Sequence, residues 1–391
     1  MVLTKFLSNF LGVQMAHGRF AGLMAGMAFI LAGCASSDEG LLIPLGRSAV
    51  GGKTVTLLAA TTRAAAPAES SGHIFGGDRD APEHINYTLL TLSLPPDRKK
   101  GELPVSADKP DPQKHITLVS VHPVDAAGAA AFLRSEALRR PANQRSALVF
   151  THGFNTRFDD AAMRFGQIIA DSDFKGVPVL FSWPSRGEVS AYGYDRESAN
   201  YSRDAFERTL TMVGREKAVS GMMLFAHSMG NWLTMETLRG AVIGNNKAVT
   251  DRLNLAVLAA PDVDLDVFRS QIARLGGLQK KFILYASNDD YALRISSKLA
   301  GGKLRAGDTT DTAVFEAIGV QAHNLSGVEG GVGKNHGKAF GDSETITSIG
   351  GLLSASAGAP PRHAGPNIIA DGFTAVGDAV TGVGKVLTNH R

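Results

Sequence analysis

The chain has 391 residues, 44% of them hydrophobic and 20% charged, a balance typical of a globular protein with a full core. This balance argues against a wholly disordered chain. A formal net charge of only +3 argues against a nucleic-acid partner, which would need a concentrated basic surface. Beyond the first 33 residues, no stretch approaches the roughly 20 apolar residues that a membrane-spanning helix requires.

The start of the chain has the pattern of a secretion signal. Lys5 and Arg19 precede an apolar run at residues 20–31, which has the length of a signal-peptide core and is short for a membrane span. The run leads into residues 31–34 (LAGC), which resemble a bacterial lipobox, the motif in which a cysteine thiol carries a diacylglycerol. We therefore expect residues 1–33 to be removed as a lipoprotein signal peptide.

Cys34 is the only cysteine, so neither an intramolecular disulfide nor a cysteine-based metal cluster is possible. We expect it to be lipidated and to hold the mature protein at a membrane of the cell envelope, either the outer membrane or the periplasmic face of a membrane. An unlipidated signal peptide with a chance cysteine, or a buried thiol, is the alternative.

The next part of the chain is expected to be a tether (34–52) followed by a domain that extends to residue 340. Its N-terminal portion, 53–145, is predicted to contribute strands separated by turn-rich stretches. The predicted strands are 54–58, 85–94 and 116–121, and a short helix is predicted at 125–138.

From residue 146 onward, short apolar runs alternate with helical patterns. The runs are 146–150, 177–184, 221–225, 253–260 and 281–286, and the helices are 159–170, 198–213, 231–240 and 263–275. Continuous apolar strands that alternate with helices predict a parallel sheet buried on both faces. A last strand is predicted at 314–320, and the Gly/Ala-rich segment 341–391 is predicted to be a weakly ordered tail or a loose appended helix.

The segment 226–230 (AHSMG) follows the third apolar run directly and opens a helix. In a nucleophile elbow the serine occupies a strained strand-to-helix turn, so its flanking residues must be small. A second copy of this small-x-Ser-x-Gly pattern, centred on Ser70, has no strand before it and no periodic helix after it. We therefore predict Ser228 as the nucleophile, and the alternative is a serine that only caps a helix.

A serine hydroxyl needs a base that is itself oriented by a carboxylate. In the α/β-hydrolase fold, where nucleophile elbows occur, the acid and then the histidine follow the serine along the chain. Asp290 comes after the run 281–286 and is the predicted acid. Its neighbour Asp289 is an alternative, as is Asp262, which follows the preceding run and could instead cap a helix.

The base must come later in the chain. The histidines that follow are His323, His336, His363 and His390. His336, after a glycine-rich loop, is the predicted base. His323, just after the predicted last strand, is the alternative, and the other two lie in the tail. His152 precedes the elbow and is interpreted as shaping a loop.

The predicted oxyanion hole takes one N–H from Met229, the residue after the nucleophile, and one from Phe154 in the loop after the first run. The alternative for that loop is an ordinary turn that begins a helix. Three aromatic residues in the loop after the second run could line a substrate pocket: Trp183, Tyr192 and Tyr194.

Five segments together are similar to a bacterial α/β-hydrolase family of unassigned function in the esterase/lipase superfamily, whose members are often lipoproteins. They are 150–155 (FTHGFN), 181–185 (FSWPS), 226–230 (AHSMG), 260–264 (APDVD) and 285–293 (YASNDDYAL). The resemblance extends over about residues 54–340 and matches Ser228 to the family's nucleophile and Asp290 to its acid. His336 matches less closely, because an aromatic residue is expected shortly after it and Gly337 and Lys338 stand there.

The fold class is therefore predicted to be α/β, an α/β-hydrolase fold with a mostly parallel central sheet, helices on both faces and no large cap domain. The predicted function is carboxylesterase action on small or medium esters through an acyl-enzyme, with a small-molecule ester as partner. No cofactor, metal or nucleic acid is expected. The alternatives are a catalytically silent envelope lipoprotein that uses the fold for binding, and an acyltransferase or amidase with the same triad.

Overall fold

The computed structural model describes residues 40–68, 70, 72–329 and 335–357. The predicted signal peptide, Cys34, His363 and His390 lie outside the described residues.

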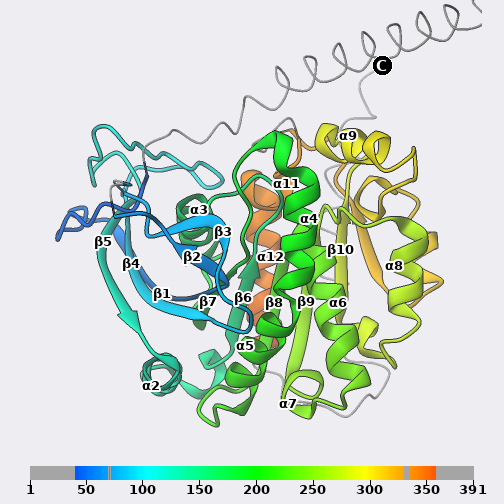
Figure 1. The fold of residues 1–391 in the computed structure, drawn as a ribbon, viewed down its shortest axis with the longest axis horizontal. Helices are drawn as coiled ribbons and strands as arrows, with labels where there is room; N and C mark the ends of the chain where they lie inside the picture. The colour runs from blue at the N-terminus through cyan, green and yellow to red at the C-terminus, as the bar shows by residue number, and fades with distance from the viewer. Residues whose placement is uncertain (1–39, 69, 71, 330–334, 358–391) are drawn as a thin grey trace, which may run out of the picture.

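One nine-stranded sheet organises the molecule (Figure 1). Its strands are β1 (Lys53–Thr61), β4 (Asn86–Leu94), β5 (Thr117–Val124), β6 (Ala147–Thr151), β7 (Val177–Ser182), β8 (Met222–His227), β9 (Leu253–Ala259), β10 (Phe282–Ala286) and β11 (Gln321–Asn324). The order across the sheet is β11-β10-β9-β8-β6-β7-β1-β4-β5. Neighbours from β11 to β1 run parallel, whereas β1 pairs antiparallel with β4 and β4 antiparallel with β5. A separate hairpin-like pair joins β2 (Arg63–Ala65) to β3 (Phe75–Arg79).

Helices cover both faces of the sheet, as predicted. They are α2 (Ala126–Leu138), α3 (Phe158–Asp171), α4 (Tyr192–Tyr201), α5 (Arg203–Arg215), α6 (Met229–Ile243), α7 (Lys247–Thr250), α8 (Leu265–Ile272), α9 (Tyr291–Leu299), α10 (Ala313–Glu316), α11 (Lys338–Gly341) and α12 (Ser343–Ala357). Figure 1 shows α4, α5 and α6 on one face and α12 on the other. No helix among the described residues is long and apolar enough to cross a membrane.

Two hydrophobic cores follow from the two-residue period of the strands. In β1, Leu58 and Ala60 pack into the core shared with α2, α5, α6 and α8, whereas Leu57 and Ala59 pack into the core shared with α3 and α12. The central strands β6, β7 and β10 are buried along their whole length. Their continuous apolar sequences are explained by this burial on both faces.

Two elements differ from the sequence prediction. The predicted last strand at 314–320 is wrong, because α10 and a turn occupy this segment and the strand follows as β11. Phe315 and Val320 are both buried, but the chain between them forms a helical turn and not a strand with side chains on alternating faces. The single helix predicted at 198–213 is divided into α4 and α5 at Ser202, whose hydroxyl bonds the Ser198 carbonyl and the Thr62 hydroxyl.

The predicted boundaries of the domain are also revised. Within the predicted tether, residues 40–52 pack on the domain: Leu42 is buried, and the Leu45 N–H donates to the Leu118 carbonyl. At the other end, the segment from residue 341 is predicted from the sequence to be a weakly ordered tail or a loose appended helix. Its described part contains α12, which is helical and contributes Ile349 and other side chains to the core. A Cβ at Gly350 would lie 2.1 Å from the Ser172 carbonyl oxygen. The small residues that suggested weak order therefore allow close packing.

We predict that α12 contributes measurably to stability. Ile349→Ala, at a fully buried position, should lower the free energy of unfolding by about 2–4 kcal/mol, because it removes a side chain from a close-packed core. The matched control Ile243→Ala, at a position 65% exposed, should change it by less than about 0.5 kcal/mol. Urea denaturation of both variants measures the difference, and equal effects would show that α12 is not part of the cooperative fold.

Candidate active site

Ser228 lies at the junction of β8 and α6 with a backbone φ of 51° and ψ of −120°. A non-glycine residue in such a sparsely populated region costs about 1–3 kcal/mol and persists only where its surroundings fix it. The Ser228 N–H donates to the Ala259 carbonyl at 3.0 Å, and the Ser228 carbonyl accepts from the N–H groups of Asn231 and Asp262. The turn predicted around this serine is therefore present, and hydrogen bonds to both its N–H and its carbonyl hold it.

Two glycines make this turn possible through close approach. A Cβ on Gly230 would lie 2.5 Å from the His152 carbonyl oxygen, and one on Gly153 would lie 2.8 Å from the Ser228 Cβ. The loop after β6 is thus packed directly against the serine, with no room for a side chain between them.

Asp290 and His336 form a hydrogen-bonded pair although they are 46 residues apart. Asp290 Oδ2 lies 2.7 Å from His336 Nδ1, and Asp290 Oδ1 accepts the Leu293 N–H as the N-cap of α9. The carboxylate is fully buried and sits at a helix N-terminus, where the helix dipole favours negative charge. Its orientation toward the imidazole is therefore fixed by the start of α9.

His336 lies beside the residue that precedes Ser228. The His227 ring bonds the His336 carbonyl oxygen at 3.2 Å, and the two imidazole centroids are 4.6 Å apart. Phe340, four residues after His336, also packs edge-on against His227, with ring centroids 4.9 Å apart. The loop that carries His336 therefore docks on the end of β8, next to the elbow.

Burial of the His336 ring lowers its pKa, but the Asp290 carboxylate opposes this through its charge and its hydrogen bond, and Asp262 adds a weaker attraction. The net effect raises the pKa of His336 above its ordinary value. The pair therefore stabilises the protonated imidazole, the form that a general base reaches during proton transfer.

The alternative acids have other partners. Asp262 forms an ion pair with Arg305 at 3.2 Å and accepts hydrogen bonds from the hydroxyl groups of Tyr192 and Ser296. Asp289 pairs with Lys338 at 2.6 Å. Each carboxylate is thus engaged by a cation of its own.

The alternative histidines are also accounted for. His323 lies within β11, where its ring stacks on Tyr285 at 5.3 Å. The His152 ring bonds the Gly153 carbonyl and the Ser182 hydroxyl, and burial together with the charge of Arg63 lowers its pKa to about 3. His152 is therefore neutral and shapes the loop, in line with its interpretation from the sequence.

Lys338 is a site component that the sequence indicated only as a departure from the family pattern. Its ammonium group is buried and contacts both carboxylate oxygens of Asp289, the Leu325 carbonyl at 3.0 Å and the Ser287 hydroxyl at 3.2 Å. Lys338 stands two residues after His336. These contacts anchor the His336 loop to the loop after β10.

The loop after β6 carries one of the amides predicted for the oxyanion hole. The N–H of Asn155 donates to Asp195 and the N–H of Thr156 to Ser185. In the part of the chain that the structure describes, the N–H groups of Phe154 and Met229 donate to no protein acceptor. Both predicted amides are therefore available to a ligand, as is the N–H of Gly153.

Arg63 is a second component that sequence reasoning missed. Its guanidinium is completely buried and donates to the carbonyl groups of Thr156, Ser185 and Gly76. Burial lowers the pKa of Arg63 to about 10, so it remains charged at neutral pH. Arg63 stands two residues after β1, and through it the N-terminal part of the chain fixes the loop that carries Phe154.

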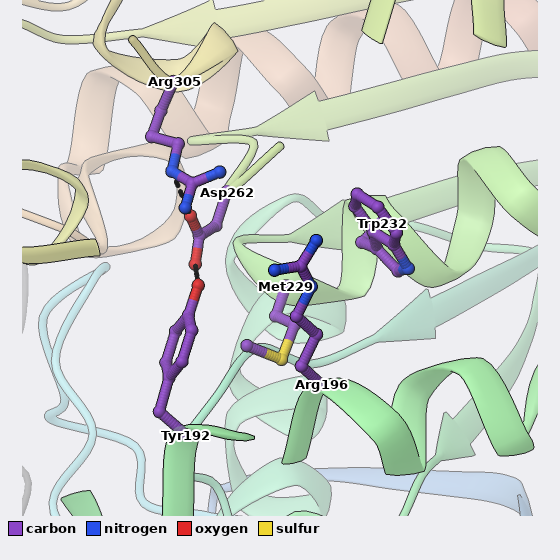
Figure 2. Close-up of a pocket in the computed structure, with 6 residues that line it drawn as sticks. All are labelled: Tyr192, Arg196, Met229, Trp232, Asp262 and Arg305. Atoms are coloured by element: carbon purple, nitrogen blue, oxygen red, sulfur yellow. Dashed lines mark hydrogen bonds and ion pairs between the residues drawn. The ribbon is translucent and has the colours of Figure 1, made fainter. Parts of the chain in front are cut away.

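A small pocket opens beside Met229, the residue after Ser228 (Figure 2). Its lining residues are Tyr192, Arg196, Met229, Trp232, Asp262 and Arg305. Of the three aromatic residues expected at a pocket, only Tyr192 lines this one. Trp183 is buried and donates to the His152 carbonyl, and Tyr194 packs against the guanidinium groups of Arg79 and Arg186.

Among the described residues, no cluster of three or more His, Cys, Asp or Glu side chains could hold a metal ion.

Comparisons with known proteins give one family and several structures. A family model described as "Alpha/beta hydrolase of unknown function (DUF900)" matches residues 131–351, which is more than half of the chain and includes Ser228, Asp290 and His336. No curated protein matches significantly.

Similar solved structures include a brefeldin A esterase, described as a bacterial homologue of human hormone sensitive lipase (12% identity, TM-score 0.37, 86% of this chain and 85% of that one). A Pyrobaculum calidifontis esterase is 13% identical, with a TM-score of 0.33, over 60% of this chain and 95% of that one. Thermogutta terrifontis esterase 2 is also 13% identical, with a TM-score of 0.34, over 70% of this chain and 91% of that one.

We predict that Lys338→Met reduces both stability and turnover. Methionine keeps most of the aliphatic volume but leaves Asp289 and the Leu325 carbonyl without their donor, which should cost about 1–2 kcal/mol. Turnover should fall because the His336 loop loses its anchor. Thermal unfolding and ester hydrolysis measure the two effects, with Lys298→Met on the exposed side of α9 as the control. Wild-type values for Lys338→Met would contradict the anchoring role.

Proposed function

Because the chain belongs to the alpha/beta hydrolases of unknown function (DUF900), we propose that it is a serine hydrolase that cleaves carboxylic esters through an acyl-enzyme on Ser228. One contact supports this above all, the hydrogen bond of 2.7 Å between Asp290 and His336 on a loop docked beside the strained serine. A base that is oriented by a buried carboxylate is what a serine hydroxyl needs in order to act as a nucleophile.

In the first half of the reaction, His336 accepts the hydroxyl proton while Ser228 Oγ bonds to the carbonyl carbon of the ester. The carbonyl electrons move to its oxygen, and the N–H groups of Phe154 and Met229 stabilise the resulting oxyanion. When the carbonyl re-forms, the bond to the alcohol oxygen breaks and this oxygen takes the proton from His336. The products are the free alcohol and an acyl-enzyme.

In the second half, water gives a proton to His336 and its oxygen bonds to the acyl carbon. Collapse of this intermediate breaks the bond to Ser228 Oγ, which recovers the proton from His336, and the carboxylic acid leaves. In both halves Asp290 fixes the ring with a proton on Nδ1 and stabilises the imidazolium that forms.

The proposed substrates are small or medium esters. The pocket beside Met229 encloses only about 10 Å³, room for about one water molecule, which favours a small substrate group there over a large one. An acyltransferase or an amidase would use the same groups, and the identity of the acceptor or of the scissile bond would separate them from an esterase.

The proposed location is the cell envelope, with a lipid anchor on Cys34. Support comes from the sequence alone, from the apolar run at 20–31 and the small residues that precede the sole cysteine. Acyl chains on Cys34 would keep the domain at a membrane surface.

We predict that a fluorophosphonate probe labels the wild-type chain and Ser70→Ala but not Ser228→Ala. Ser70 is the matched control because it has the same small-x-Ser-x-Gly context without the strand and helix. Labelling is read by gel fluorescence and by mass spectrometry of the modified peptide. A wild-type chain that is folded and unlabelled would favour the binding protein over the enzyme.

The pH profile tests the partnership of His336 and Asp290. The base must be neutral to accept a proton, so activity should rise with pH through the raised pKa of His336, above the ordinary value of about 6.5. Asp290→Asn removes the charge that raises this pKa, so the acid limb of kcat/KM should move to lower pH. The rate should also fall by about 10²–10⁴.

Asp266→Asn, on the exposed face of α8, is the matched control for this loss of charge. It should leave the profile in place. An Asp290→Asn profile that overlays the wild-type profile would show that Asp290 does not control the base.

A further inference from the structure

The pocket beside the serine contains a cation that no carboxylate neutralises. Arg196 extends from α4, and its guanidinium carbon lies 4.7 Å from the centroid of the Trp232 ring on α6. Within the described ranges, Arg196 forms no ion pair. Figure 2 shows its guanidinium beside Met229 and Trp232, separate from the series formed by Tyr192, Asp262 and Arg305.

The other charges of the pocket balance one another. The Asp262 carboxylate is paired with Arg305 and receives the hydroxyl hydrogens of Tyr192 and Ser296. The two charged side chains, Asp262 and Arg305, are buried, and their net charge is close to zero. Arg196 therefore gives the pocket an excess of one positive charge, which would attract an anionic group.

Stacking on Trp232 prepares Arg196 for such a role. Cation–π contact holds the guanidinium against the ring without using any of its N–H donors. A guanidinium presents those donors in a planar fork that matches a carboxylate with two parallel hydrogen bonds. Trp232 is itself fixed, because its indole N–H donates to the Asn200 side chain at 2.7 Å.

The pocket joins this cation to the residue after the nucleophile. Met229, which follows Ser228 directly and opens α6, lines the same pocket as Arg196. Trp232, on which Arg196 stacks, stands about one helical turn after Ser228 along α6. An anion at Arg196 and an ester carbonyl at Ser228 can therefore belong to one small molecule.

We propose that the substrate is a small ester that carries a free carboxylate, in its acyl or its alcohol part, bound by Arg196 at this pocket. This inference rests on the proposed function, since it names the substrate class of the same serine. The half-ester of a short dicarboxylic acid is the simplest member of the class. Its hydrolysis follows the two steps given above, with the carboxylate unchanged.

The test compares two p-nitrophenyl esters of equal chain length, the butyrate and the monoester of succinic acid. Wild type should hydrolyse the succinate monoester with the higher kcat/KM, mainly through a lower KM. Arg196→Gln should reduce the ratio of the two kcat/KM values by about two- to fivefold, the range expected for one exposed charge pair. Added salt should reduce the wild-type ratio as well, because it screens this attraction.

Arg215→Gln is the matched control, an equal loss of charge at an exposed position at the end of α5. It should leave the ratio unchanged. A second pair of substrates, 4-acetoxybenzoate and its neutral methyl ester, has the carboxylate on the alcohol side. A preference for the charged member of this pair that depends on Arg196 would show that the pocket binds the leaving group and would still support the inference.

The outcomes separate this inference from the proposed function. Hydrolysis of the neutral esters with no preference for a charged partner, or an equal loss on both partners in Arg196→Gln, would overturn the carboxylate site and leave the serine hydrolase in place. Failure of the fluorophosphonate to label Ser228, with no hydrolysis of any ester, would overturn the proposed function itself.

Discussion

The backbone conformation of Ser228 is the constraint on which the rest of the site depends. A positive φ at a non-glycine residue is unfavourable, and three surrounding segments compensate for it. The end of β9 accepts the Ser228 N–H, α6 begins at once and supplies Asn231, and the loop after β6 closes in where Gly153 has no side chain. These three segments thus hold the Ser228 backbone in its unfavourable conformation. That conformation places the hydroxyl at the carboxyl edge of the parallel strands, where binding sites of such sheets form.

Two adjacent carboxylates after β10 position His336 through different contacts. Asp290 caps α9 and holds the imidazole ring itself, whereas Asp289 forms an ion pair with Lys338, two residues farther along the same loop. One interaction orients the ring and the other fixes the backbone that carries it.

The N-terminal strands are joined to the site as well as to the sheet. β1 pairs with β7 in the sheet, and the buried Arg63, two residues after β1, donates hydrogen bonds to the carbonyl groups of Thr156 and Ser185. Those bonds, together with Asp195, fix the loop that leaves the Phe154 amide free. A buried cation whose hydrogen-bond partners in the described structure include no carboxylate is costly. Its role in holding this loop gives a physical reason for that cost.

The sequence alone determined the local parts of this protein. Apolar runs and their alternation with helices located the strands of the parallel sheet, because burial on both faces leaves few polar positions. The small residues around Ser228 indicated the elbow, because only they fit it. Tertiary structure decided which acid meets which histidine, since Asp289 and Asp290 are neighbours in sequence and only α9 turns one of them toward His336. It also decided the roles of Arg63 and Lys338 and the helix at 343–357, because their partners lie far away along the chain and no local pattern records them.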